Sequence, residues 1–190
     1  MTGLNTENHG WQIGLDEAGR GAVIGPLVIG CVAATPEGIA EMERIKVEDS
    51  KALNPTKREQ IHESIISLNP EILRWEIIQA SPEQIDRAVV ERSLNELELD
   101  LFADAVAKIK HLEVGTIVAD ACDSNAERFG QRLSSRLLGH GINFPVLAEH
   151  KADLNHVVVA AASIVAKVAR DRAIDVLSEE VDIQFGSGYP

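Results

Sequence analysis

The stretch Ile13-Gly14-Leu15-Asp16-Glu17-Ala18-Gly19-Arg20-Gly21 is the most informative part of this chain. A short apolar run ends there in two adjacent acids, which a glycine-rich turn follows. Acids at the end of a strand can bind a divalent cation, and the bare amides and guanidinium of the turn suit an anionic ligand. A cation beside a phosphate is an arrangement that cuts or transfers a phosphodiester. An isolated turn of this kind is more often a solvated surface turn, so this interpretation requires further acids.

The apolar runs on either side of the turn, 11–15 and 23–34, predict an antiparallel pair of strands. Further strands are expected at 72–78, 116–121 and 146–149, and helices at 55–68, from 81 onward, at 89–112, at 126–138 and at 155–180. Asn54-Pro55 and Ser81-Pro82 each supply a cap followed by a proline, and Gln84 completes a capping box with Ser81. No repeats or linkers interrupt this order. The sequence therefore predicts a single α/β domain over 1–190 with a mixed sheet.

Composition and charge restrict the class of protein. A chain of 190 residues with 45% hydrophobic content can bury one core. The polar segment 1–10 lacks an apolar signal core and the apolar run 157–166 is too short to cross a bilayer, so we expect neither secretion nor membrane insertion. Cys31 and Cys122 fit neither a disulfide framework nor a zinc motif, which favours a cytoplasmic location. The net charge of −12 argues against a general nucleic-acid coat protein, although a nuclease with acids around metals remains possible.

Acids follow strand-like runs at three separate places. Asp16 and Glu17 follow the first run, Asp120 ends the run 116–119, and Asp153 lies shortly after the run 146–149. Ligand sites of α/β sheets gather at strand ends, where side chains face a crevice instead of the core. Magnesium prefers a few carboxylates with water and substrate phosphate at its remaining positions. The pattern therefore predicts a cation site that is built from three segments.

One geometric difficulty concerns the adjacent pair of acids. Successive residues of a strand point to opposite faces, so Asp16 and Glu17 cannot both face one site if the strand is regular. The glycines that follow would permit a bulge or a sharp bend that brings the two carboxylates together.

Six motifs follow one another along nearly the whole chain. They are 14–21, Glu48-Asp49-Ser50-Lys51, Ala119-Asp120-Ala121-Cys122-Asp123, His150-Lys151-Ala152-Asp153, 160–167 with Arg170-Asp171, and Gly188-Tyr189-Pro190. Taken together they resemble type 2 ribonuclease H, also called ribonuclease HII, and their residues are similar to those of the archaeal branch. The resemblance implies a ribonuclease H-like fold, in which helices flank a mixed central β-sheet.

The resemblance also implies a metal centre. Asp16, Glu17, Asp120 and Asp153 match the four catalytic carboxylates that bind two Mg²⁺ or Mn²⁺ ions in this family, with Asp16 as the shared ligand. Such ions activate the attacking water and stabilise the leaving oxygen.

Other positions match substrate-binding residues of the family. Gly19, Arg20 and Gly21 match the segment whose backbone recognises the ribose 2′-hydroxyl at an RNA–DNA junction, the group that separates RNA from DNA. Tyr189 matches the tyrosine that stacks on the adjoining deoxyribose. Lys51 matches a basic position that is expected to touch phosphate. Lys151 and Lys167 could do the same.

The activity that the resemblance implies is hydrolysis of the RNA strand of RNA–DNA hybrids and cleavage on the 5′ side of ribonucleotides embedded in duplex DNA. The products would carry 3′-hydroxyl and 5′-phosphate ends. The cellular tasks would be excision of misincorporated ribonucleotides and removal of RNA primers during DNA replication. The expected protein is a monomer, with the replication sliding clamp as a partner of a full-length form.

Several other acids have a structural explanation. Asp171, close to Lys167, is expected to form an ion pair on a helix surface, and Asp123 is expected at a helix entry near a capping Ser124. Acids also repeat every four residues along the helix predicted at 89–112, which indicates a solvated face without a function. They are Glu96, Asp100 and Asp104.

Two alternatives stay open at this point. The sibling type 3 enzyme carries an additional N-terminal domain, for which the roughly ten residues before the first strand leave no room. A non-catalytic nucleotide or phosphate binder would use 19–25 as an anion cradle, but that loop lacks the G-x-G-x-x-G pattern followed by a helix.

The end of the sequence departs from the family pattern. The family normally continues beyond Gly-Tyr-Pro into helical segments that help to hold nucleic acid, whereas this sequence stops at Pro190. We therefore expect weak, salt-dependent binding of substrate and a poorly ordered Tyr189.

Overall fold

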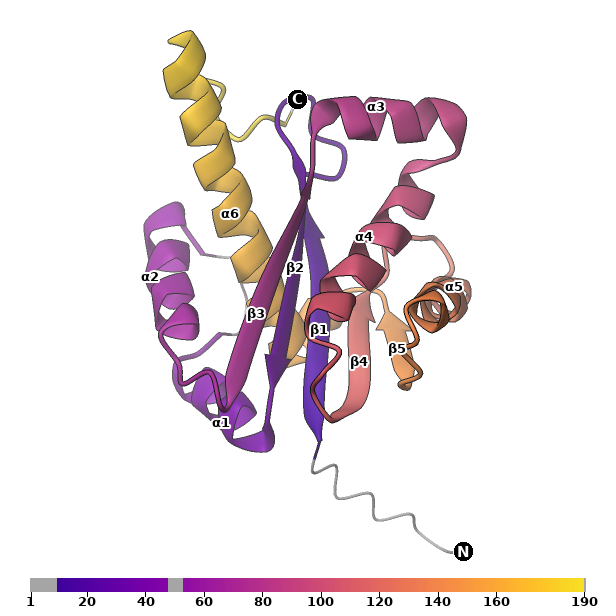
Figure 1. The fold of residues 1–190 in the computed structure, drawn as a ribbon. Coiled ribbons are helices and arrows are strands. Elements are labelled where there is room, and N and C mark those ends of the chain that lie inside the picture. The colour runs from indigo at the N-terminus through magenta and orange to yellow at the C-terminus, as the bar shows by residue number, and fades with distance from the viewer. Residues whose placement is uncertain (1–9, 48–52, 190) are drawn as a thin grey trace, which may run out of the picture.

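The computed structural model describes residues 10–47 and 53–189 of the chain. Its centre is a five-stranded sheet (Figure 1). The strands are β1 (Trp11–Ala18), β2 (Leu27–Ala34), β3 (Leu73–Ala80), β4 (Val114–Asp120) and β5 (Val146–Glu149). Their order across the sheet is β3-β2-β1-β4-β5, with β3, β2 and β1 antiparallel and with β4 and β5 parallel to β1. The predicted mixed sheet and the antiparallel first pair are confirmed.

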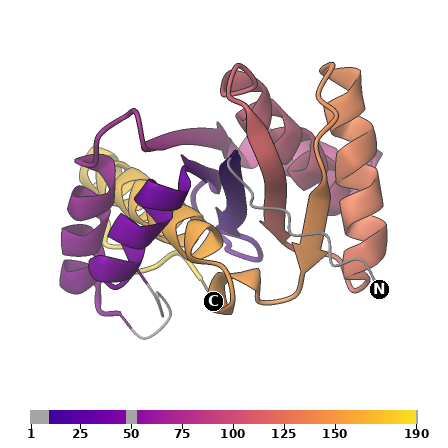
Figure 2. The ribbon, with the colours of Figure 1, turned by 90° about the horizontal axis from the view of Figure 1, so that it is seen from below.

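Helices cover both faces of this sheet, as the view from below shows (Figure 2). The first group, α1 (Pro36–Arg44), α2 (Pro55–Ile66) and α6 (Val157–Val181), packs on one face. The second group, which contains α3 (Pro82–Glu91), α4 (Leu94–Lys108) and α5 (Ala126–Gly139), packs on the other face. A short 3₁₀ helix, η1 (Ala152–Leu154), precedes α6. No helix in the described ranges is long and apolar enough to cross a membrane.

Helix α6 lies unusually close to the sheet because glycines face it. A Cβ at Gly14 would lie closer than 3.0 Å to the carbonyl group of Val158, and one at Gly30 would crowd the carbonyl oxygen of Ala162 in the same way. Residues 158–166 of α6 are all buried, as the absence of charge in that segment predicts. The close approach brings the middle of α6, which carries Ser163 and Lys167, beside the end of β1.

Three boundaries differ from the sequence-based expectations. The helix α1 was not predicted, although Thr35 caps it by accepting from the Gly38 N–H and Pro36 follows. The segment 23–26 is a loop and not part of a strand, with Val23 exposed. The predicted helix 89–112 is wrong at its start, because the chain breaks after α3 and Ser93 caps a separate helix α4.

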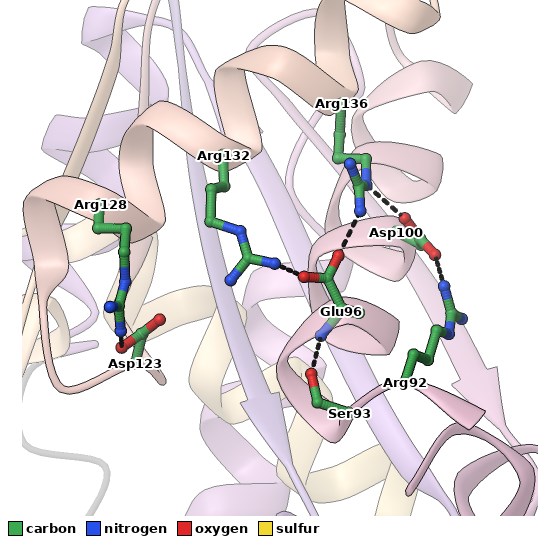
Figure 3. A network of polar contacts seen from close by, with 8 residues as sticks. All are labelled: Arg92, Ser93, Glu96, Asp100, Asp123, Arg128, Arg132 and Arg136. Carbon is green, nitrogen blue, oxygen red and sulfur yellow. Dashed lines mark hydrogen bonds and ion pairs between the residues drawn. The ribbon is translucent and has the colours of Figure 1, made fainter. Parts of the chain in front are cut away.

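The acidic stripe on α4 is not the solvated face that its spacing suggested. Glu96 pairs with Arg132 and Arg136 of α5, and Asp100 accepts from Arg136 Nε at 2.7 Å and also pairs with Arg92 (Figure 3). These partly exposed ion pairs hold α4 against α5. Phe102 of α4 and Phe129 of α5 also pack edge to face in the core between these helices. The stripe is thus structural, and no functional role is needed to explain it.

Candidate active site

Asp16 and Glu17 lie in the last regular part of β1. The ladder with β2 runs without interruption through this pair, so the bulge that the glycines would permit is absent there. The two side chains accordingly leave the strand on opposite sides, yet both remain in charge contact with Asp120 at the end of the neighbouring strand, and Glu17 with Asp16. Asp16 is hydrogen-bonded to Ser163 on α6, whereas Glu17 lies near Arg20 and Glu98 on the α4 side.

Asp120 and Asp153 come from neighbouring segments. Asp120 ends β4, next to β1 in the sheet, and its Oδ1 accepts from the Ala152 N–H at 3.1 Å. This bond attaches the turn that carries Asp153 to the end of β4. Lys151 adopts a left-handed conformation at φ 59° before that turn, and Asp153 itself is buried. The structure thus brings Asp120 close to Asp16 and Glu17, and attaches the turn that carries Asp153 to Asp120.

The carboxylates raise one another's proton affinity. Burial raises the pKa of Asp16 from its ordinary 3.8 to about 6. The hydrogen bond with Ser163 opposes this effect, and the negative charge of Asp120 adds to it. Burial, followed by the charges of Asp16 and Glu98, raises the pKa of Glu17 well above its usual range. Glu17 Oε2 is buried and has no hydrogen-bond partner among the described residues. An unsatisfied carboxylate oxygen in a cluster of acids fits a divalent cation, which would replace the protons.

We predict that this site makes the stability of the metal-free protein dependent on pH. Because the pKa of Asp16 is raised to about 6 in the folded protein, the folded state binds a proton at Asp16 more tightly than the unfolded state does. This contribution to stability is complete at pH values below the ordinary pKa of 3.8 and is lost as the pH rises through 6. In EDTA, Asp16→Asn should therefore be more stable than wild type at pH 7.5, by at most about 3 kcal/mol, and should lose this advantage by pH 4.

Urea denaturation of both proteins at the two pH values measures this difference. Mg²⁺ or Mn²⁺ should stabilise wild type at pH 7.5, by about 2.7 kcal/mol at a hundred times the dissociation constant, and should not stabilise Asp16→Asn. A difference between the two proteins that is independent of pH and metal would show that Asp16 does not belong to a cation site.

The glycine-rich loop begins immediately after these acids. Gly19 and Gly21 have φ values of 100° and 75°, which side chains other than glycine rarely adopt, and a turn closes from the Ala22 N–H to the Gly19 carbonyl oxygen at 3.1 Å. The Gly19 N–H donates to the hydroxyl of Tyr189 at 3.0 Å. The Arg20 side chain, 34% exposed, turns toward α4: its guanidinium pairs with Glu98 and donates to Asn95 Oδ1 at 2.8 Å.

Arg170 holds the end of the described chain against this loop. It is 2% exposed and donates to the carbonyl oxygens of Ser187 at 2.7 Å and Ile24 at 2.9 Å. Its guanidinium lies 4.7 Å from the centre of the Tyr189 ring. Tyr189 thus contacts both the loop and Arg170. The sequence contained Arg170-Asp171 as a motif, but nothing in it indicated contacts with residues 24 and 187.

The remaining expectations for the site have different outcomes. Lys51, with its motif 48–51, lies outside the described residues. Lys167 is close enough to Asp16 to lower its pKa in part, although burial is the larger effect and raises it.

The two acids that were expected to be structural do have structural partners. Asp123 lies at a helix entry, where Arg128 donates to it at 2.5 Å and holds its pKa down at about 2. The cap of α5 is Asn125 and not Ser124. Asp171 forms its ion pair with Arg58 of α2 at 2.8 Å.

Among the described residues, three other possible ligands cluster on α2, away from the predicted site. They are Glu59, His62 and Glu63. Arg172 of α6 already pairs with both carboxylates, so the cluster is explained as an ion pair between α2 and α6. His62 of this cluster is buried.

Comparison with known proteins identifies the family. The model of the family described as Ribonuclease HII matches residues 13–190. This chain belongs to the ribonuclease HII family. The ribonuclease HII of Thermococcus sibiricus (strain DSM 12597 / MM 739) is 43% identical over 177 residues, which are 93% of this chain and 75% of that relative.

Solved structures of ribonuclease HII share the fold. The ribonuclease H2 from Pyrococcus horikoshii OT3 matches with a TM-score of 0.81 at 39% identity, over 95% of this chain and 81% of that one. The structure of the PCNA:RNase HII complex from Archaeoglobus fulgidus matches with a TM-score of 0.81 at 37% identity, over 94% and 80% of the two chains. The ribonuclease H-like fold and the resemblance to archaeal ribonuclease HII are thus confirmed.

Membership of this family makes the chain a nuclease, with ribonuclease H activity on RNA–DNA hybrids. Dependence on metal ions is general to the family. The type 3 enzyme and the non-catalytic phosphate binder are therefore set aside.

Proposed function

We propose that this ribonuclease HII cuts on the 5′ side of single ribonucleotides in duplex DNA as well as within continuous hybrids, leaving 3′-hydroxyl and 5′-phosphate ends. The observation that supports this best is the order of residues around the end of β1. Asp16, which is buried, and Glu17, which is partly buried, lie three and two residues before Gly19, whose amide faces Tyr189. Metal binding and sugar recognition would therefore occur side by side on one strand end.

The proposed cofactor is a pair of Mg²⁺ or Mn²⁺ ions held by Asp16, Glu17, Asp120 and Asp153. When bound, such ions position the scissile phosphate and activate the attacking water. The chain's own contribution is to hold these acids in place: Asp16 through Ser163, Asp120 through the Ala152 N–H, and Asp153 on the turn that this bond fixes. Asp16, close to both Glu17 and Asp120, is the proposed shared ligand.

Substrate recognition is proposed for Gly19, Arg20, Gly21 and Tyr189. The backbone of the loop would read the 2′-hydroxyl, and the Tyr189 ring, 47% exposed, would stack on the adjoining deoxyribose. The bond from the Gly19 N–H to the Tyr189 hydroxyl joins the two elements that would recognise the two sides of an RNA–DNA junction. Lys51, Lys151 and Lys167 are proposed as phosphate contacts.

Tyr189→Phe should weaken this connection while retaining the ring. Because the substituted ring can still pack under Arg170, we expect little change in stability. Loss of the single hydroxyl contact should lower kcat/KM for a one-ribonucleotide duplex about 3- to 10-fold, which corresponds to roughly 1 kcal/mol. Steady-state kinetics measure this effect, with a continuous hybrid as the comparison substrate. An equal loss on both substrates would argue against a role at the junction.

Cleavage of a labelled RNA–DNA hybrid tests the proposed metal chemistry. We expect cutting in Mg²⁺ or Mn²⁺, none in EDTA, and none of the matched DNA duplex. A polymerase should extend the 3′ ends, which requires a 3′-hydroxyl, and a phosphatase should remove the 5′-phosphate. Cleavage in EDTA, or products with 3′-phosphate ends, would contradict two-metal hydrolysis.

The proposed partners follow from the same function. The substrate is an RNA–DNA hybrid or a DNA duplex with embedded ribonucleotides, during ribonucleotide excision repair and DNA replication in the cytoplasm. The Archaeoglobus fulgidus relative was solved in complex with PCNA, which supports a sliding clamp as a partner of this chain. We propose a monomer in the absence of the clamp. A sedimentation measurement with and without the clamp would test both statements.

A further inference from the structure

Glu98 is a buried acid that the proposed chemistry does not use. It lies on α4 with 0% exposure, on a helix whose buried side is otherwise apolar. Burying a carboxylate costs several kcal/mol unless charged and polar partners compensate for the lost water. A core at this position would be served as well by an apolar side chain of similar volume. Its presence therefore calls for an explanation from its partners.

Two partners of Glu98 come from segments that leave the candidate active site. Arg20, from the glycine-rich loop, pairs with it, and the thiol of Cys122, two residues after Asp120, is hydrogen-bonded to it. The side-chain oxygen of Asn95, one turn earlier on α4, accepts a hydrogen bond of 2.8 Å from the second amino group of Arg20. Helix α4 thus presents two acceptors, three residues apart, to a single guanidinium.

The loop is supported unevenly on the two sides of Arg20. The Gly19 N–H donates to the Tyr189 hydroxyl and a Cβ on Gly19 would meet the carbonyl oxygen of Pro26, whereas no heavy atom lies within 4 Å of the position that a Cβ on Gly21 would occupy. The two-point attachment of Arg20 to α4 therefore supports the side of the loop that is otherwise open. The ion pair with Glu98 also neutralises the charge of Arg20, so this guanidinium is less available to bind phosphate.

We propose that Glu98, assisted by Asn95, is a positioning residue that fixes the Gly19-Arg20-Gly21 backbone for recognition of the ribose 2′-hydroxyl. Arg20 is then an anchor for the loop and not a phosphate contact. This inference rests on the proposed function of the loop. It assigns to α4 a part in substrate discrimination that its sequence, which contains an ordinary run of acids and leucines, does not reveal.

Kinetics of Glu98→Ala and Glu98→Gln test the proposal on a duplex with one ribonucleotide. We expect kcat to fall about 10- to 100-fold for Glu98→Ala, because a misplaced recognition group costs turnover, with KM changed less than kcat. Glu98→Gln, which keeps an acceptor for Arg20, should recover part of the loss. Glu96→Gln is the matched control: it removes an acid two residues away that pairs with α5, and should leave kcat unchanged.

Two further measurements distinguish anchoring from a general effect on folding. In a double-mutant cycle, Arg20→Ala with Glu98→Ala should cost no more in kcat than the larger single effect. Arg20→Ala should also leave the salt dependence of substrate binding unchanged, whereas loss of a phosphate contact would reduce the slope by about 1. If Glu98→Ala fails to fold, Asn95→Ala provides the same test, with an expected fall in kcat of about 3- to 10-fold.

Additive effects of Arg20 and Glu98, a reduced salt slope, or unchanged kcat in folded Glu98→Ala would each overturn the proposal. These outcomes are distinct from a failure of the proposed function. In that case wild type itself would not cleave the one-ribonucleotide duplex.

Discussion

Asp16→Asn is expected to abolish cleavage while leaving the fold intact. Asp16 lies between Glu17 and Asp120 in charge contact with both, so its loss removes the proposed shared ligand for both ions. The amide keeps the size of the side chain and can still bond to Ser163. We expect the single-turnover rate on an RNA–DNA hybrid to fall at least about 1000-fold in saturating Mg²⁺.

Asp123→Asn is the matched control for this experiment. Asp123 is another buried acid, three residues after Asp120, but Arg128 and the Asn125 N–H already bind it. This variant should retain cleavage. Full activity of a folded Asp16→Asn protein, with circular dichroism and unfolding like wild type, would refute the assignment of the metal site.

Gly14→Ala is expected to have the largest effect on stability. The added methyl group would overlap the carbonyl carbon and oxygen of Val158 and the amide nitrogen of Val159. These atoms belong to the backbone of α6, so no side-chain rotation relieves the overlap and the helix must move away from β1. We expect a loss of about 3 kcal/mol or more in the free energy of unfolding, at the upper end of the range for overpacked cores.

Gly139→Ala is the control for the backbone entropy of a glycine. Gly139 ends α5, and nothing lies within 4 Å of the position that its Cβ would take. That change should leave stability unchanged or raise it by up to about 1 kcal/mol. Urea denaturation compares both variants with wild type. A Gly14→Ala protein as stable as wild type would show that α6 does not contact the sheet as closely as described.

Local signals made much of the fold predictable. The caps at Asn54 and Ser81 act within four residues, and the structure confirms both, including the capping box with Gln84. The break between α3 and α4 was missed because apolar periodicity continues across it, and only the Ser93 cap marks it. Val23 and Ile24 have side chains that are typical of strands, but they lie in a loop. The positive φ of Gly25 turns the chain there, and Arg170 donates a hydrogen bond to the carbonyl oxygen of Ile24.

The proximity of three of the acids was predictable from their positions at strand ends. Asp16, Glu17 and Asp120 each end an apolar run, and the structure places them close together. Glu98 and Arg170 could not be predicted in this way, since the loop partner of each, Arg20 for Glu98 and Ile24 for Arg170, lies 78 and 146 residues away along the chain. A helix pattern gives the face on which a side chain lies but not the loop that will meet it.

One strand end is proposed to combine metal-dependent cleavage with recognition of a single 2′-hydroxyl. Two DNA duplexes that differ only in one sugar, ribose or deoxyribose at the same position, test it directly in Mg²⁺ or Mn²⁺. We predict one cut, on the 5′ side of the ribose, with no cleavage of the deoxyribose duplex and none of either in EDTA. Equal cleavage of both duplexes, or no cleavage of the ribose duplex in any metal, would contradict it.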